Sequence, residues 1–262
     1  MLDADATVAA LTERPRRTVL LSDYDGSLAP IVERPEDAGP LPGVVETLGA
    51  LVARLGRVAI VSGRPVEFLA TELPVPGLAF AGLYGMERLQ DGRRTVDPRV
   101  EPFRDAVAAA LSSAQARFGD ALVERKADVS LTLHWRPAPE VREDMLSCAH
   151  ELARRYGLSE LHTRMAVELR PPIAIDKGAA VASFLDGFDV GAFAGDDTGD
   201  LPAFAELELA VDDGRLDRAV RIGVVSPEAP ADLVRAVDVV TDGPAGLLAL
   251  LRRVADEIRE PA

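Results

Sequence analysis

The sequence predicts an α/β fold in which a doubly wound, mostly parallel sheet forms the core and a smaller α+β domain is inserted into it. Short apolar runs that stop in glycine-containing turns alternate with amphipathic helical segments, as in parallel βαβ units. In the middle of the chain the pattern changes to alternating polar and apolar residues, which is typical of antiparallel strands. We therefore expect a core of residues 1–87 and 172–262 and an inserted domain of residues 88–171.

The core elements follow from the apolar runs and from helical periodicity. Before the insertion, strands are predicted at residues 18–21, 57–61 and 78–81, and helices at residues 44–55 and 66–73. After it, strands are predicted at residues 191–194, 207–211, 221–225 and 239–241, and helices at residues 178–185 and 245–258. Four prolines between residues 30 and 42, around the charged segment 33–37, predict an exposed loop.

The inserted domain is predicted to begin with a hairpin, because Asp91 and Gly92 are turn formers between two short alternating runs. Helices are expected at residues 100–118 and 139–156, and strands at residues 122–126, 129–136 and 165–169. Pro171 and Pro172 end the insertion.

The first predicted strand ends in Asp23-Tyr24-Asp25-Gly26. Side chains at i and i+2 of an extended chain project to the same side, so Asp23 and Asp25 can serve one centre. Neighbouring carboxylates repel each other unless a cation neutralises them, and oxygen ligands of this kind suit Mg²⁺. An ordinary acidic turn is the alternative interpretation, because Asp and Gly both favour turns.

Three further segments carry polar residues where predicted strands end or helices begin. Ser62 and Gly63 follow the second strand, where a hydroxyl and backbone N–H groups can bind an anion, although Ser is also a common helix cap. Lys177 begins a helix, which disfavours a cation unless an anion lies beside it; a solvated surface lysine is the alternative. The acidic run of residues 196–200 follows another buried strand and predicts a divalent cation.

The composition limits the partners that the protein can have. A formal net charge of -14 opposes bulk attraction to nucleic acid or anionic lipid. The first residues carry acids where a signal peptide would carry bases, and no apolar run has the length of a membrane span. The lone Cys148 excludes an internal disulfide. We expect a cytoplasmic monomer that binds a small molecule rather than nucleic acid or a membrane.

Taken together, these motifs resemble those of the haloacid dehalogenase-like phosphatases, and in particular their trehalose-6-phosphate phosphatase branch. The resemblance covers most of the chain and rests on residues 21–31, 61–64, 124–136, 168–171 and 195–197. It implies a Rossmann-like core of the haloacid dehalogenase type with an inserted cap domain that selects the substrate.

The resemblance also implies roles for the acidic residues of the core. Asp23 would be the nucleophile that forms an aspartyl phosphate, and Asp25 would act in turn as general acid and general base. Mg²⁺ would be held by the Asp23 side chain, the Asp25 carbonyl and Asp196. Asp197 and Asp200 would belong to the outer shell of the metal.

The same resemblance implies which residues hold the substrate. Ser62, Gly63 and Lys177 would bind the phosphoryl group. The cap would grip the uncharged sugar through charge-assisted hydrogen bonds. The residues expected to contact substrate are Arg64 of the core and Glu124, Lys126, His134, Arg136 and Glu168 of the cap.

The implied function is a Mg²⁺-dependent phosphoric monoester hydrolase of trehalose biosynthesis, which converts trehalose 6-phosphate to trehalose and phosphate. A phosphatase of sucrose 6-phosphate or of a glycosyl phosphoglycerate is an alternative, because the cap decides the substrate. A non-catalytic phosphosugar-binding regulator is a second alternative, although binding alone needs no attacking carboxylate. The sequence departs from the family in the turn Leu83-Tyr84-Gly85, which lacks the Asn or His often found before this glycine, and in having fewer acids after Asp197.

Overall fold

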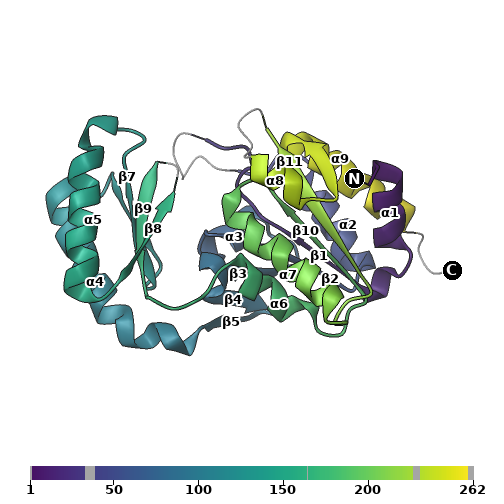
Figure 1. Cartoon of the computed structure of the whole chain (residues 1–262), viewed down its shortest axis with the longest axis horizontal. Coiled ribbons are helices and arrows are strands. Elements are labelled where there is room, and N and C mark those ends of the chain that lie inside the picture. The colour runs from purple at the N-terminus through teal and green to yellow at the C-terminus, as the bar shows by residue number, and fades with distance from the viewer. Residues whose placement is uncertain (1, 33–38, 164, 227–230, 259–262) are drawn as a thin grey trace. The chain divides into compact units, whose positions relative to one another are not determined.

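The computed structural model describes residues 2–32, 39–163, 165–226 and 231–258 (Figure 1). The described chain forms two compact units. The larger unit contains the described residues of Met1–Ile31, Ala38–Thr95 and Ile175–Ala262, and the main segment of the smaller unit is Val96–Ala174. The predicted charged loop at residues 33–37 lies outside the described residues.

An eight-stranded sheet forms the centre of the larger unit, with the strand order β12-β11-β10-β1-β2-β3-β4-β5. The six strands from β12 to β3 are parallel, and β4 pairs antiparallel with β3. This confirms the predicted mostly parallel sheet. The strands are β1 (Thr18–Ser22), β2 (Arg57–Val61), β3 (Ala79–Gly82), β4 (Glu87–Gln90), β5 (Arg93–Val96), β10 (Val190–Gly195), β11 (Arg218–Val225) and β12 (Val239–Asp242).

Helices cover both faces of this sheet, so that β1 is buried along its whole length. Val19 and Leu21 pack in a cluster with the helices that follow the insertion, whereas Leu20 between them projects to the opposite face and is also buried. The helices of this unit are α1 (Ala4–Thr12), α2 (Val44–Arg54), α3 (Val66–Glu72), α6 (Lys177–Leu185), α7 (Leu201–Asp212), α8 (Ala231–Ala236) and α9 (Gly243–Glu257), with 3-10 turns η1 (Pro15–Arg17), η3 (Leu83–Gly85) and η6 (Thr198–Asp200).

The smaller unit is a four-stranded antiparallel sheet with helices on one face, in the strand order β6-β7-β9-β8. Leu131, Leu133, Val167 and Leu169 project toward the helices and form its hydrophobic core with them. The alternate residues therefore form a second, more polar face. The elements are η4 (Pro98–Phe103), α4 (Arg104–Phe118), β6 (Val123–Lys126), β7 (Ser130–His134), η5 (Pro139–Val141), α5 (Arg142–Tyr156), β8 (Ser159–Thr163) and β9 (Ala166–Arg170).

The boundary between the units differs from the expected one at residue 88. The predicted hairpin exists, but its strands β4 and β5 extend the large sheet, and the smaller unit begins at Val96. Local alternation identifies a hairpin but does not say which sheet it joins, since that depends on pairing with β3, for example Gly82 with Glu87.

One predicted strand is wrong. Residues 207–211 form part of helix α7, because Phe204, Leu207 and Ala210 recur at helical spacing and are buried, whereas Leu209 is exposed. The prediction also missed helices α1 and α8 and strand β8, a half-exposed strand at the edge of the small sheet. Over the part of the chain that the structure describes, no helix is both long and apolar enough to cross a membrane.

Two substitutions in α7 test this correction. Leu207→Ala should lower the free energy of unfolding by about 2–5 kcal/mol, because it removes a side chain from the core. Leu209→Ala should change it by no more than about 0.5 kcal/mol, since Leu209 is 53% exposed. Urea denaturation measures both. Similar losses in the two variants would indicate that both side chains share one buried face, as in a strand.

Candidate active site

The candidate catalytic residues of the core lie at the carboxyl ends of three adjacent parallel strands. Asp23 follows β1, Ser62 follows β2 and Asp196 follows β10, and β1 pairs with both of the other strands. After β1 the chain adds β2 and β3 on one side of β1, and later in the sequence it adds β10, β11 and β12 on the other side. Such a switch point is where open α/β sheets bind their ligands.

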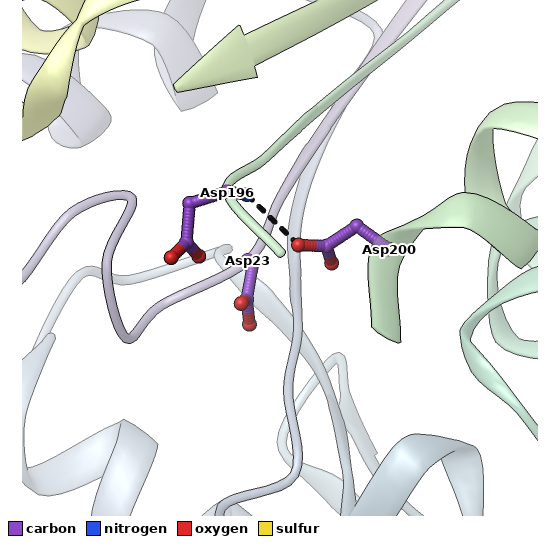
Figure 2. Close-up of side chains that lie close together, drawn as sticks. All are labelled: Asp23, Asp196 and Asp200. Carbon is purple, nitrogen blue, oxygen red and sulfur yellow. Dashed lines mark hydrogen bonds between the residues drawn. The ribbon is translucent and has the colours of Figure 1, made fainter. Parts of the chain in front are cut away.

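Three carboxylates gather at this edge of the sheet (Figure 2). Asp23, Asp196 and Asp200 each offer an oxygen, and these oxygens lie within 4.8 Å of one another. Asp200 is fully buried and accepts hydrogen bonds through Oδ2 from the backbone N–H groups of Asp196 (2.9 Å) and Asp197 (3.1 Å). Asp200 thereby fixes the turn that presents Asp196, whereas the exposed Asp197 caps η6 by accepting from the Gly199 N–H (2.7 Å).

Lys177 brings a positive charge into this acidic cluster. Its Nζ lies 2.8 Å from Asp23 Oδ2 and 2.6 Å from Asp200 Oδ1, and all three side chains are buried. Lys177 is the first residue of α6, whose preceding residue Asp176 accepts a hydrogen bond from the Ala179 N–H. The structure thus brings Asp23 together with Lys177 and the acidic run, which lie more than 150 residues later in the sequence.

Burial and repulsion shape the protonation of these groups. Burial raises the pKa of Asp23 well above its ordinary value, and the nearby acids add to this effect while Lys177 opposes it. Burial, together with the charges of Asp200 and Asp197, raises the pKa of Asp196 to about 8. Burial alone would lower the pKa of Lys177, but the charges of Asp200 and Asp23 outweigh it and raise the pKa. If all three carboxyl groups were ionised, the cluster would carry more negative charge than Lys177 offsets.

These residues fit a divalent cation. Carboxylate oxygens at this spacing are the ligands that Mg²⁺ prefers, and a cation would offset the repulsion that, together with burial as the larger cause, raises the pKa values. Asp200 belongs to this cluster of three carboxylates, but its oxygens already accept hydrogen bonds from Lys177 and from two backbone N–H groups. These bonds suit a residue that orients the neighbours of the metal. The carboxylate of Asp25 does not belong to this cluster.

Asp25 instead forms a bidentate ion pair with Arg64. Arg64 Nε and Nη2 each lie 2.8 Å from one oxygen of the Asp25 carboxylate. The guanidinium also stacks over the Phe68 ring, with its carbon 4.7 Å from the ring centroid. Arg64 was expected to contact substrate, and its pairing with Asp25, 39 residues earlier in the chain, was not predicted.

The loop that carries Ser62, Gly63 and Arg64 is held by a strained turn. Leu83 and Tyr84 adopt φ values of 50° and 60°, which are uncommon for residues with side chains. In this conformation the Leu83 N–H donates to the Arg64 carbonyl (3.0 Å) and the Tyr84 N–H to the Ser62 carbonyl (2.9 Å). Strain of this kind, about 1–3 kcal/mol per residue, is typical of functional sites and persists only where surrounding structure enforces it.

The buried side chain of Glu87, which was not predicted as a site residue, also holds the segment that follows the Ser62 loop. Glu87 is fully buried at the start of β4, where it accepts from the Val66 N–H (3.1 Å) and pairs with Arg94. It thereby fastens the beginning of α3, directly after the Ser62 loop, to the hairpin of β4 and β5. Its position after an apolar strand was visible in the sequence, but its burial was not.

In the smaller unit, most of the predicted sugar-binding residues form a cluster of hydrogen-bonded pairs on the polar face of the sheet. Lys126 Nζ donates to Glu168 Oε2 (2.8 Å), and His134 Nε2 lies 2.8 Å from Glu124 Oε2. Ser130 Oγ, which was not predicted, donates to Glu168 Oε1 (2.7 Å). The alternation of Ser130, Thr132 and His134 along β7 was the signal that could have identified it.

Arg136 stands apart from this cluster. It follows the end of β7 and is half-buried, and no hydrogen bond joins it to the four other predicted cap residues within the described chain. The site residues proposed from the sequence thus fall into two groups, one in each unit.

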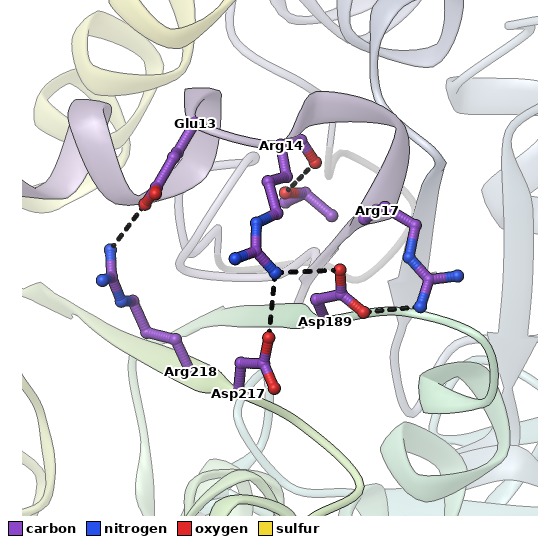
Figure 3. Close-up of polar contacts among 7 residues, drawn as sticks. Glu13, Arg14, Arg17, Asp189, Asp217 and Arg218 are labelled. Carbon is purple, nitrogen blue, oxygen red and sulfur yellow. Dashed lines mark hydrogen bonds and ion pairs between the residues drawn. The ribbon is translucent and has the colours of Figure 1, made fainter.

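The charged residues at the opposite end of the large sheet form ion pairs instead of a site (Figure 3). Arg14 contacts Asp189 (3.2 Å) and Asp217 (2.9 Å), and Arg17 contacts Asp189 (2.5 Å). Both arginine side chains are more than half exposed, so each pair contributes little stability. These pairs join the segment before β1 to the segments before β10 and β11.

The mostly parallel sheet, with a separate α+β unit inserted between β5 and α6, is a fold that the chain shares with a solved haloacid dehalogenase-like hydrolase of Bacteroides thetaiotaomicron, at a TM-score of 0.60 and 16% identity. The family is clear from the sequence: residues 21–228 match the family model described as trehalose-phosphatase. The chain belongs to the trehalose-phosphatase family.

Known proteins with similar sequences include a trehalose-phosphate phosphatase of Mycobacterium tuberculosis, 30% identical over 257 residues, with 94% of this chain and 63% of that protein aligned. An uncharacterized glycosyl hydrolase of the same species is 35% identical over 171 residues, which are 63% of this chain and 13% of that protein. The chain therefore spans less than two thirds of the length of these relatives. The solved C-terminal domain of the C. albicans trehalose-6-phosphate phosphatase shares the fold, with a TM-score of 0.78, 21% identity and 97% of each chain covered.

The packing around Gly26 gives a test of the site geometry. Gly26 has a φ of 77°, and a Cβ at this position would lie 2.1 Å from Asp196 Oδ2. Gly26→Ala should therefore lower the free energy of unfolding through both backbone strain and displacement of the Asp196 carboxylate. Gly92→Ala is the matched control, because Gly92 has a φ of 74° and open space around it.

In urea denaturation, Gly92→Ala should cost about 1–2 kcal/mol. Gly26→Ala should cost at least about 1 kcal/mol more, since close contacts in a packed site add to the strain. Equal losses in the two variants would contradict the close approach of Gly26 and Asp196.

Proposed function

We propose that this chain is a Mg²⁺-dependent phosphatase that hydrolyses trehalose 6-phosphate to trehalose and phosphate. Family membership and the trehalose-phosphate phosphatase of M. tuberculosis support this reaction. The observation that carries the proposal is the buried Asp23 carboxylate at the end of β1, 2.8 Å from Lys177 Nζ and close to Asp196. A cytoplasmic location and a monomeric state stay predictions from the sequence.

In the first step, a carboxylate oxygen of Asp23 attacks phosphorus. The bond between this oxygen and phosphorus forms while the bond between phosphorus and the sugar oxygen breaks, which leaves an aspartyl phosphate. Asp25 donates a proton to the departing sugar oxygen. Because Asp25 is paired with Arg64 in the structure, this step requires that Arg64 release it.

In the second step, water attacks the phosphorus of the aspartyl phosphate. Asp25, now a carboxylate, accepts a proton from this water, and the bond between phosphorus and Asp23 breaks to release phosphate. One carboxyl group thus serves both steps, and the enzyme returns to its starting protonation.

The remaining core residues hold the phosphoryl group. Ser62, Gly63 and Lys177 would bind its oxygens, and Lys177 would also offset the carboxylates as negative charge is redistributed in the transition state. A bound Mg²⁺, held by the side chains of Asp23 and Asp196 and the carbonyl of Asp25, would neutralise the carboxylates and so allow an anionic substrate to approach. Asp200 would orient Lys177 and Asp196.

The smaller unit would act as the cap that recognises the sugar. Its polar face offers carboxylates that accept from sugar hydroxyls and cations that donate to them. The proposed sugar-binding residues are Glu124, Lys126, His134, Arg136 and Glu168, with Arg64 contributing from the core.

Phosphate release from trehalose 6-phosphate, sucrose 6-phosphate and p-nitrophenyl phosphate, with and without Mg²⁺, tests this function. We expect trehalose 6-phosphate to be the preferred substrate and Asp23→Asn to lower its kcat by about 10³-fold or more, because the attacking oxygen is lost. Asp217→Asn is the control: Asp217 belongs to the exposed ion pairs at the opposite end of the sheet and should leave kcat unchanged.

Equal kcat/KM values for all three substrates would refute the substrate assignment. Retained turnover in Asp23→Asn would refute the nucleophile. Tight binding of trehalose 6-phosphate without turnover would favour the non-catalytic regulator.

Metal binding can be measured without turnover. Mg²⁺ at about 100 times its Kd should stabilise the protein by about 2.7 kcal/mol, seen as a rise in the thermal midpoint, because the folded state alone holds the ligands together. Asp196→Asn should abolish this rise. Asp197→Asn should keep it, because Asp197 is exposed and Asn also caps helices. A full rise in Asp196→Asn would rule out Asp196 as a ligand.

A further inference from the structure

The polar face of the small sheet contains a buried hydroxyl that its neighbours leave without a hydrogen bond. Thr132, in the middle of β7, is only 3% exposed. Among the residues that the structure describes, its Oγ1 has no partner. Buried polar groups are nearly always satisfied, so this exception needs an explanation.

Thr132 lies between two carboxylates. In the register of the sheet it is directly opposite Glu124 on β6 and Glu168 on β9. Directly opposed residues project to the same face with their Cβ atoms about 4.5–5.5 Å apart. The hydroxyl therefore lies within the row of residues that we propose to bind the sugar.

The groups around Thr132 are already paired with one another. Glu168 accepts from Ser130 through Oε1 and from Lys126 through Oε2. Glu124 Oε2 is paired with His134. Thr132 thus keeps both its donor and its acceptor capacity, although charged and polar side chains surround it.

Stability alone would favour valine at this position. Valine has the same shape as threonine, suits a strand equally well and buries no hydroxyl. Proteins often give up stability in this way where a residue contacts a ligand.

The surroundings select the kind of ligand. Two flanking carboxylates would repel a phosphate oxygen, whereas a neutral sugar hydroxyl can accept from Thr132 and donate to a carboxylate. We infer that Thr132 Oγ1 hydrogen-bonds a hydroxyl of the sugar part of the substrate and is a specificity-determining residue. This inference rests on the proposed function and adds to it a residue that binds the sugar and does not contact the phosphate.

The test compares Thr132→Val with the wild-type chain on trehalose 6-phosphate and on p-nitrophenyl phosphate, which carries no sugar. The variant should raise the KM for trehalose 6-phosphate about three- to tenfold, as expected for one lost hydrogen bond. Its KM for the aryl phosphate should not change, and its thermal midpoint should not fall. Thr132→Ser, which keeps the hydroxyl, should retain most of the wild-type preference.

Ser130→Ala is the matched control, because the Ser130 hydroxyl on the same strand has a protein partner in Glu168. Its loss should lower the thermal midpoint, in contrast to Thr132→Val. An unchanged KM for the sugar phosphate in Thr132→Val, or an equal loss on both substrates, would overturn the inference. So would a lower midpoint with unaltered preference, which would indicate a structural partner such as a bound water.

The same assays separate this inference from the proposed function. If the wild-type chain hydrolyses sucrose 6-phosphate but not trehalose 6-phosphate, the proposed substrate is wrong, while a raised KM for sucrose 6-phosphate in Thr132→Val still supports the role of Thr132. A wild-type chain that hydrolyses no sugar phosphate overturns both.

Discussion

Lys177 lies between the buried carboxylates of Asp23 and Asp200, and the geometry of the core site depends on this contact. An ammonium group and carboxylates are costly to bury singly, so their pairing holds three segments in one place: the end of β1, the start of α6 and the turn before α7. Asp200 extends the network by receiving the N–H groups of Asp196 and Asp197. The proposed nucleophile Asp23, the ammonium group of Lys177 and the proposed metal ligand Asp196 are thereby held close together.

The cluster has three carboxyl groups and Lys177 can neutralise only one of them, and the proposed metal binding depends on this excess. Burial and mutual repulsion raise the pKa values of Asp23 and Asp196, which is unfavourable for the folded protein at neutral pH but favours capture of a divalent cation. A neighbouring part of the site is strained as well, since Leu83 and Tyr84 hold positive φ values to satisfy the carbonyls of Ser62 and Arg64. This strained and repulsive arrangement depends on the surrounding packed structure to hold it in place.

The two units divide the work that the proposed reaction needs. Asp23, Lys177 and Asp196, which would act on the phosphoryl group, lie at strand and helix ends of the larger unit. The polar face of the small sheet consists of hydrogen-bonded pairs, Lys126 with Glu168 and Glu124 with His134, which suit hydroxyl groups of a neutral sugar. Since related enzymes can share the core chemistry, differences in substrate would be expected in side chains of this second surface. Thr132 belongs to this surface, and its buried hydroxyl has no hydrogen-bond partner among the described residues.

The sequence by itself determined the parallel core, the inserted α+β segment and the identity of the core acids, because apolar runs that end in Asp or Ser are local patterns. It did not determine whether residues 207–211 form a strand or a helix, since a five-residue apolar run fits both periods until the burial of Phe204 and Ala210 is known. Nor could it assign β4 and β5 to the large sheet, pair Asp25 with Arg64, or reveal that Glu87 and Thr132 are buried. Strand pairing, burial and side-chain contacts join residues far apart in the chain, and only the tertiary structure decides them.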